Sequence, residues 1–341
     1  MRAALIIIII MMVAAASIAA AHSNCFITIN NDQLSLLIGP SNASYLLKLI
    51  NSANSSIYVE AYEFTYWPLA NELINASRRG VEVTIVLSGN VYGGVPSSED
   101  AIINELNSSG ARIRFMYGYD FTHSKVFIID NETAVLGSIN PTYYGLTRDL
   151  GIDVVIRNST VAHELANVII EDYEGRPIAI NYPGIVVSPI NSAQCIGWLL
   201  NVPGTLYMAM EELYPSSGEF GAVLLHDHRY VVLNDYEENQ AASMELGARL
   251  LSGLTAKAIV IGGYTYIGSI NLDSTSLSSN REIGIIIHNP ALAKRVALII
   301  AAWYDEAHAS RRPNYLLLAV ILVIIALAAW GLARRRLRLK T

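Results

Sequence analysis

The stretch H-S-K-V-F-I-I-D, residues 123–130, decides how the rest of the chain is interpreted. Its apolar run predicts a strand, and alternate residues of a strand point to the same face. The imidazole of His123 and the ammonium of Lys125 should therefore lie side by side, and two such cations repel each other unless they face an anion. G-S-I-N follows at residues 137–140, and the amide of Asn140 suits close contact with an oxyanion. Together these residues predict an anion-binding site.

The chain carries a second copy of this region. G-S-I-N recurs at residues 268–271, an offset of 131, whereas Pro40 in the first copy matches Pro189 in the second at an offset of 149. The second copy is therefore about 18 residues shorter in its middle, the difference between 149 and 131.

Val-, Ile- and Tyr-rich runs such as residues 81–87 and 283–287 are typical of strands covered on both faces by helices. The predicted fold class is α/β, with two pseudo-symmetric α/β/α layered repeats. The expected boundaries are residues 22–178 for the first repeat and 179–310 for the second.

These features resemble the phospholipase D superfamily, which is named for an HxKx4D motif followed by GSxN. The resemblance covers about residues 35–290, and the first motif is intact. It implies two α/β/α units related by a pseudo-twofold axis, with one active site in the cleft between them. It also implies that the chemistry needs no metal and no other cofactor.

The resemblance assigns roles to particular residues. His123 is expected to be the nucleophile that forms a phosphohistidine, and the carboxylate downstream of each motif is expected to hold that motif's histidine. Those carboxylates are Asp149 and Glu282. The motif's Asp130 is expected to be mostly structural. The expected phosphate ligands are Lys125, Asn140, Lys257 and Asn271, and the expected supporting residues are Ser138, Thr255, Ser269 and Asp273.

The second copy departs from the family pattern. L-T-A-K stands at residues 254–257 where the family has L-H-A-K, so Thr255 replaces the second histidine. The motif's aspartate is replaced by Gly262 or lost with a one-residue deletion. The segment that follows, residues 268–282, resembles the cardiolipin synthase branch, with Thr275 where that branch has Arg.

A threonine hydroxyl cannot act as an acid at physiological pH, and loss of general acid catalysis typically costs about 10²–10⁴-fold in rate. Glu282 is accordingly expected to lack its imidazole and to turn to Thr255 or Lys257. An alternative is that His226 or His228, in L-L-H-D-H-R-Y, supplies the acid. That pair could also be read as metal ligands, a weaker interpretation because no further ligands are nearby.

The two ends of the chain predict membrane segments. Residues 3–21 and 315–333 each run for 19 residues without a charge, long enough to cross a bilayer core. The first, residues 1–21, is expected to be a signal peptide or signal anchor. The second, residues 314–333, is expected to span the membrane with the basic tail, residues 334–341, in the cytoplasm.

This topology places residues 22–313 outside the cytoplasm, where they carry 17 Lys and Arg against 29 Asp and Glu. So acidic a body disfavours nucleic acid as a partner. Cys25 and Cys195 are compatible with one disulfide or with two buried thiols. Six N-x-S/T sequons suit an exported glycoprotein; they begin at Asn42, Asn54, Asn75, Asn107, Asn131 and Asn158.

Three functions remain open from the sequence. The first is a membrane-anchored phosphodiesterase or phosphatidyltransferase that acts on phospholipid through His123. The second is a pseudoenzyme that binds a phosphate-bearing ligand without turnover, which the change at Thr255 favours and the intact first motif disfavours. The third is a nuclease, which the acidic body disfavours. The oligomeric state is left undetermined.

Overall fold

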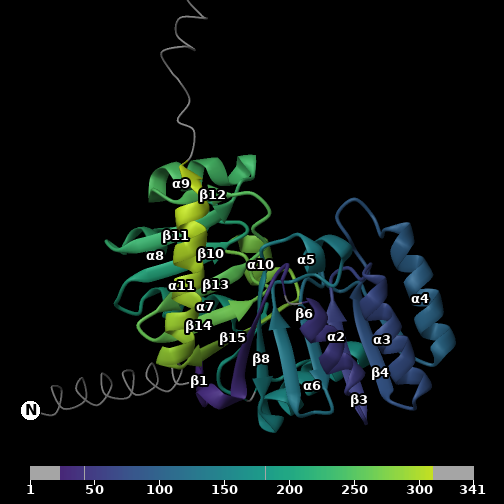
Figure 1. Ribbon diagram of the computed structural model, residues 1–341. Coiled ribbons are helices and arrows are strands. Elements are labelled where there is room, and N and C mark those ends of the chain that lie inside the picture. Colours follow the sequence, from purple (N-terminus) through teal and green to yellow (C-terminus); the bar gives the residue numbers. More distant parts are fainter. Residues whose placement is uncertain (1–23, 42, 181, 310–341) are drawn as a thin grey trace, which may run out of the picture. The chain divides into compact units, whose positions relative to one another are not determined.

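Two β-sheets, one in each repeat, organise the computed structural model, which describes residues 24–41, 43–180 and 182–309 (Figure 1). Both sheets belong to the unit that ends at Ala309. The α/β fold class predicted from the sequence is confirmed. The predicted membrane segments lie outside the described residues, and within those residues no helix is long and apolar enough to cross a membrane.

The first repeat has a seven-stranded sheet among its described residues, in the order β2-β8-β7-β6-β3-β4-β5. Its strands are β2 (Leu34–Ile38), β3 (Ser56–Ala61), β4 (Glu82–Ser88), β5 (Arg112–Met116), β6 (Lys125–Ile129), β7 (Thr133–Gly137) and β8 (Ile152–Arg157). Its helices are η1 (Asn31–Gln33), α2 (Ala43–Asn51), α3 (Trp67–Arg78), α4 (Ser97–Ser109), α5 (Tyr143–Thr147) and α6 (Ser159–Glu174).

The second repeat repeats this order, with short strands added at both edges. Its sheet contains β1 (Ile27–Thr28), β9 (Ile185–Ser188), β10 (Leu206–Met210), β11 (Arg229–Asn234), β12 (Arg249–Leu251), β13 (Lys257–Ile261), β14 (Tyr264–Gly268), β15 (Glu282–His288) and β16 (His308–Ala309). Its helices are α7 (Ser192–Leu200), α8 (Gly218–Leu224), η2 (Glu237–Asn239), α9 (Gln240–Leu246), α10 (Ser274–Ser278) and α11 (Pro290–Glu306).

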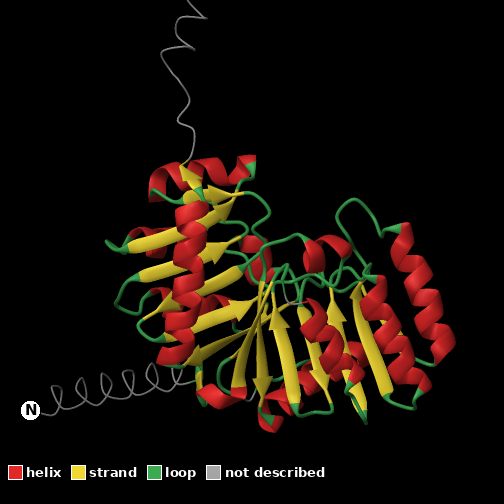
Figure 2. Cartoon of the chain, viewed as in Figure 1, coloured by secondary structure: helices red, strands yellow, loops and turns green. Residues whose placement is uncertain are grey.

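Helices cover both faces of each sheet (Figure 2). Leu69 and Leu73 of α3 pack on one face of the first sheet, and Ile196 and Leu199 of α7 pack on the corresponding face of the second. The opposite faces of both sheets share one core with α6 and α11. Burial of these apolar faces is the main force that holds the two repeats together.

The repeats also join through backbone bridges beside the two motifs. Thr122 pairs in parallel with Arg281, and Leu150 pairs with Leu254 in the same way. Thr122 and Leu254 each come just before the first position of a motif, whereas Arg281 and Leu150 come just before strands β15 and β8 of the opposite repeat. The two motifs are therefore brought to one place by symmetric contacts.

A disulfide ties the start of the described chain to the second repeat. Cys25 precedes β1 and is bonded to Cys195 in α7, 170 residues away. Of the two alternatives left open by the sequence, the structure shows the disulfide. A link of this kind constrains the unfolded chain and thereby stabilises the fold.

Candidate active site

A cavity of about 440 Å³ lies where the two repeats meet, and it contains the first motif's histidine. Its lining combines aromatic, carboxylate and amide side chains from both repeats: Tyr62, Tyr92, Phe121, His123, Glu211, Glu212, Tyr214, Asn271, Asp273, Thr275, Ser276 and Asn280. Three of the sequence-predicted site residues, His123, Asn271 and Asp273, are among them.

His123 is held by a carboxylate from the opposite repeat. Its Nδ1 lies 3.1 Å from Oε1 of Glu282, and Nδ2 of Asn280 donates to the same oxygen at 3.1 Å. Burial lowers the pKa of His123, with Lys125 adding to the effect and Glu282 opposing it. A neutral imidazole that donates from Nδ1 leaves the lone pair of Nε2 free. That is the state a nucleophilic histidine requires.

The expectation that each carboxylate serves its own motif is therefore wrong. Glu282 does not lack an imidazole, because the bridge between Thr122 and Arg281 brings it to His123. Burial opposes ionisation of Glu282, but its interactions with His123 prevail and lower its pKa. The histidine position of one repeat thus faces a residue of the other repeat, an arrangement that we call a crossed pair.

The crossed arrangement identifies what Thr255 has lost. Ser138 bonds the carbonyl of Ile152, and Ser269 bonds that of Ile283, so the position equivalent to Glu282 is Gly151. A Cβ built on Gly151 would lie 3.3 Å from Oγ1 of Thr255. The second pair has thus changed at both ends, with threonine for the imidazole and glycine for the carboxylate.

Lys125 is buried beside His123 and faces the second lysine. Its Nζ donates to the carbonyl of His123 at 2.5 Å and lies 5.6 Å from the centre of the Tyr62 ring. Burial, together with the charge of Lys257, lowers the pKa of Lys125 to about 7. An anion placed between the two ammonium groups would relieve their repulsion.

Lys257 already has a carboxylate partner, which the sequence analysis missed. Its Nζ forms an ion pair with Oε2 of Glu211, and it also donates to the carbonyl of Thr255 at 3.2 Å. Lys257 is completely buried. The offset of 149 could have revealed Glu211, because it aligns this residue with Tyr62, the aromatic neighbour of His123.

The two asparagines of the G-S-I-N segments differ in what they contact, whereas the two serines make equivalent contacts. Asn140 has a buried Oδ1 without a hydrogen-bond partner, whereas Oδ1 of Asn271 accepts from the backbone N–H of Glu212 at 3.2 Å. Ser138 and Ser269 each donate to a backbone carbonyl of the neighbouring strand in their own repeat. Asn140 thus carries an unused acceptor, and its amide hydrogens are the part suited to an anion.

The predicted aspartates lie at structural positions. Asp130 accepts from the backbone N–H groups of Asn54, Ser55 and Ser56, at distances of 2.7 to 3.1 Å. Its counterpart Gly262 faces Pro203, which has no N–H to donate, and the hairpin there is one residue shorter. Asp273 accepts from the N–H of Ser276 and begins α10.

Asp149 does not contact His123. It does not line the cavity with His123, and its surroundings are the Glu211–Lys257 pair. Burial raises the pKa of Asp149, Glu211 adds to the rise and Lys257 opposes it. The prediction that Asp149 holds His123 is therefore wrong, because Glu282 is the carboxylate that does so.

The alternative histidines also lie elsewhere. Nε2 of His226 is 2.8 Å from the carbonyl of Leu200, and His228 lines a different cavity together with Tyr230.

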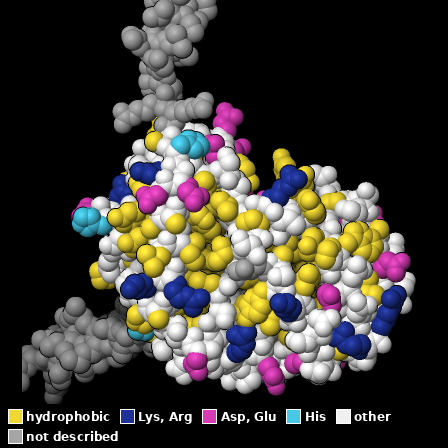
Figure 3. All heavy atoms as spheres, viewed as in Figure 1, with side chains coloured by type: hydrophobic (Ala, Val, Ile, Leu, Met, Phe, Trp, Pro, Cys, Tyr) yellow, Lys and Arg dark blue, Asp and Glu magenta, His cyan; other side chains and the backbone are white. Residues whose placement is uncertain are grey.

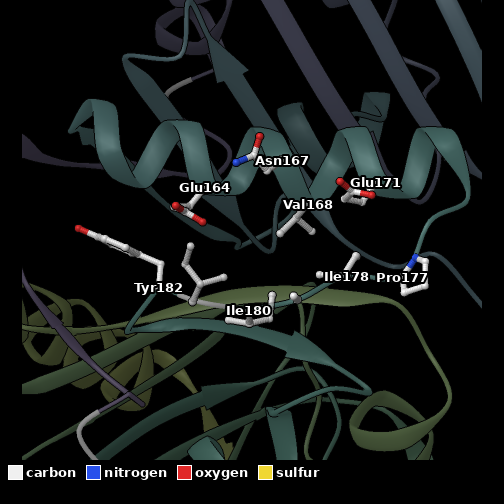
Figure 4. A pocket seen from close by; sticks show the side chains of 10 residues that line it. Glu164, Asn167, Val168, Glu171, Pro177, Ile178, Ile180 and Tyr182 are labelled. Carbon is white, nitrogen blue, oxygen red and sulfur yellow. The ribbon is translucent and has the colours of Figure 1, made fainter.

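A further cavity, of about 420 Å³, lies between α6 and the segment that joins the repeats, and Glu164 and Tyr182 face it (Figure 4). Within the described residues, no group of three or more His, Cys, Asp or Glu could hold a metal ion.

Comparison with known sequences gives one family. A family model described as the PLD-like domain of cardiolipin synthase matches residues 46–173 and 225–303, more than half of the chain. A cardiolipin synthase from Listeria welshimeri is 26% identical over 128 residues, which is 37% of this chain and 26% of the relative. The chain thus spans about a quarter of the length of the curated relatives it matches.

A solved structure shares this fold over most of the chain. The phosphatidylserine synthase of Haemophilus influenzae Rd KW20 aligns with a TM-score of 0.64 and 13% identity, over 91% of this chain and 98% of that one. Nuc of Salmonella typhimurium, described as a phospholipase D family member, is 30% identical with a TM-score of 0.39. The match covers 41% of this chain and 95% of Nuc.

Proposed function

The chain belongs to the family of phospholipase D (PLD)-like domains of cardiolipin synthase, and from this premise we propose that it cleaves phosphodiesters through a phosphohistidine on His123. The observation that carries the proposal is the contact of 3.1 Å between Nδ1 of His123 and Glu282. It orients the imidazole and stabilises the positive charge that develops when Nε2 attacks phosphorus.

The neighbouring groups support the same step. Lys125, Lys257 and the amides of Asn140 and Asn271 are the donors available for phosphate oxygens. They are buried or partly buried, where electrostatic stabilisation of a developing charge is stronger than in water. The attack forms a bond between Nε2 and phosphorus and breaks the bond to the leaving oxygen. Water or an alcohol then takes the phosphoryl group from His123.

We propose a phospholipid as the substrate. Tyr92 lines the cavity and is 87% exposed. Tyr144 and Trp67 are exposed on α5 and α3. Exposed aromatic side chains of this kind suit a lipid–water interface. In Figure 3 the Lys and Arg side chains are scattered over the visible face, unlike the basic patch of a nucleic-acid-binding protein.

We further propose that the body is attached to a membrane and lies outside the cytoplasm. The support is the pair of uncharged segments at residues 3–21 and 315–333 and the basic tail that follows the second. Protease added to intact cells should then digest the body and spare the tail. Complete protection of the body would contradict this topology.

The test of the proposed activity is to incubate the full chain with phospholipid in detergent micelles, quench the reaction and search by mass spectrometry for a phosphatidyl adduct on His123. We expect the adduct in the wild type and none in His123→Ala. The change of Thr255 and Gly151 favours a second candidate, a protein that binds phosphate without turnover. That candidate would give binding of the lipid with no adduct and no product.

A further inference from the structure

Because Thr255 stands in place of the second imidazole, the cleft lacks the family's general acid. A leaving alkoxide needs a proton, and Thr255 cannot supply one at physiological pH. That acid cannot be supplied from Gly151, because a Cβ there would lie 2.5 Å from Cγ1 of Ile139. If the chain is an enzyme, some other titratable group must face the phosphate that His123 attacks.

Glu211 occupies the required position by symmetry. In the first repeat Ala61 pairs with Lys125, and in the second Met210 pairs with Lys257, so the residues that follow, Tyr62 and Glu211, are equivalent. Tyr62 packs its ring against His123 with the ring centres 4.9 Å apart. Glu211 therefore enters the shared cavity from the second repeat as Tyr62 does from the first.

The carboxylate of Glu211 is held in place from several sides. The hydroxyl of Tyr236 donates to its Oε1 at 3.3 Å, Lys257 pairs with its Oε2, and Nδ2 of Asn239 fixes its carbonyl at 2.7 Å. Its neighbour Glu212 is engaged differently, because Tyr214 donates to that carboxylate at 2.9 Å. Glu211 is thus the carboxylate whose ion-pair partner is itself an expected phosphate ligand.

We propose that Glu211 is the general acid and base that takes the place of the absent second histidine. The inference rests on the proposed function and extends it to a residue that carries no family motif. Glu211 and His123 line the same cavity. Lys257 is the ion-pair partner of Glu211 in the free protein and is also an expected ligand of the bound phosphate.

The proton balance follows from this exchange of partners. When a phosphodiester binds, its oxygens take over the ammonium of Lys257, and Glu211 takes up one proton from solvent. As Nε2 of His123 bonds to phosphorus and the phosphorus–oxygen bond breaks, the Glu211 proton passes to the leaving oxygen. The Glu211 carboxylate then accepts a proton from the incoming water or alcohol, whose oxygen bonds to phosphorus as the phosphorus–nitrogen bond breaks.

The charges around Glu211 agree with that sequence. Burial raises its pKa, but Lys257 and then His123 and Lys125 oppose this, so its pKa is lowered in the free protein. A bound anion neutralises the lysines and leaves the effect of burial unopposed, which raises the pKa. The same carboxyl group is therefore ionised at rest and protonated in the substrate complex.

The experiment compares the full-length wild type with Glu211→Gln on two substrates. Bis-p-nitrophenyl phosphate has a leaving group that needs no acid, whereas phosphatidylglycerol in mixed micelles has one that does. We expect Glu211→Gln to lower kcat/KM for phosphatidylglycerol by about 10²–10⁴-fold. It should still release a burst of p-nitrophenolate and should accumulate the phosphohistidine on His123, because its second step lacks a base.

Two further variants serve as controls. Glu211→Asp keeps a carboxyl group and should recover part of the phosphatidylglycerol activity. Glu245→Gln changes an exposed carboxylate on α9 and should leave both activities unchanged. Thermal unfolding by circular dichroism establishes that each variant is folded.

Equal losses on both substrates, without an accumulated adduct, would overturn the proposal and reduce Glu211 to a partner of Lys257. Unchanged activity in Glu211→Gln would overturn it as well. A wild type that turns over neither substrate would refute the proposed function itself, and that outcome is distinguishable because it does not depend on any variant.

Discussion

Arg281 and Asp172 form a buried ion pair that joins the second repeat to the first directly beside the candidate site. Nε of Arg281 lies 3.0 Å from Oδ2 of Asp172 in α6, and Nη1 of Arg281 donates to the carbonyl of Ser188 at 2.9 Å. The guanidinium also lies over the ring of Tyr119, 4.4 Å from its centre. Arg281 immediately precedes Glu282, so this pair fixes the strand that presents Glu282 to His123.

Removing one member of that pair should destabilise the fold strongly. Arg281→Ala leaves Asp172 as an uncompensated buried charge, and such changes cost about 3–5 kcal/mol in the free energy of unfolding. Chemical denaturation followed by circular dichroism measures the loss. The double variant Arg281→Met, Asp172→Leu should recover much of it. A loss below about 1 kcal/mol for the single variant would contradict this account.

Binding of a simple anion should depend on pH through Lys125. The pKa of Lys125 is lowered to about 7 in the free protein, so above that pH the amine must take up a proton when an anion binds. Affinity for sulfate, which keeps its charge, should therefore fall by up to about tenfold more per pH unit above pH 7 than below it, because proton uptake by Lys125 adds to the uptake proposed for Glu211. Calorimetric titration measures this, and Lys125→Met should remove the additional slope above pH 7. An additional slope that persists in that variant would assign the effect to another group.

Glu282→Gln should impair catalysis and lower the pKa of His123 further. Glu282 raises the pKa of His123, opposing burial, so its loss shifts protonation of the imidazole to lower pH. Loss of the orienting carboxylate in a comparable His–Asp arrangement costs about 10⁴-fold in kcat. Titration of His123 by NMR and steady-state kinetics measure the two effects. An unchanged pKa would show that the contact with Nδ1 does not persist in solution.

Thr255→His by itself should restore little activity toward poor leaving groups. The new imidazole would face Gly151, which offers no carboxylate, and Glu282 is engaged with His123. We expect less than about tenfold improvement, since orientation is a large part of what a general acid contributes. Combining it with Gly151→Asp and Ile139→Ala, which opens the space for a side chain, should give more. A full recovery in the single variant would show that the imidazole needs no partner there.

The repeats and the place of His123 at the cleft were predictable from the sequence, because H-x-K and the two G-S-I-N segments are local patterns. The crossed pairing of Glu282 with His123 was not, because it joins residues 159 apart through the bridge at Thr122. A usable signal did exist. The offset of 131, carried beyond Asn140 and Asn271, aligns Glu282 with Gly151 and not with Asp149.

Glu211 and Arg281 escaped prediction for a different reason. A lone carboxylate or guanidinium in a sequence is most often a solvated surface group. The offset of 149 aligns Glu211 with Tyr62, but only the fold shows that Glu211 pairs with Lys257 inside the cleft. Only the fold shows likewise that Arg281 is buried between the repeats.

The crossed pairs have a consequence for how such a chain can change over evolutionary time. Thr255 and Gly151 belong to different repeats and are 104 positions apart. A histidine at the first position would be useful only with a carboxylate at the second, and the reverse also holds. Once either member was lost, selection on the other would vanish, and drift at a distant position would follow without further cost. Degeneration in this architecture should therefore appear as coupled losses across the two repeats, leaving one half of the symmetry intact around His123 while the other half is free to acquire new residues.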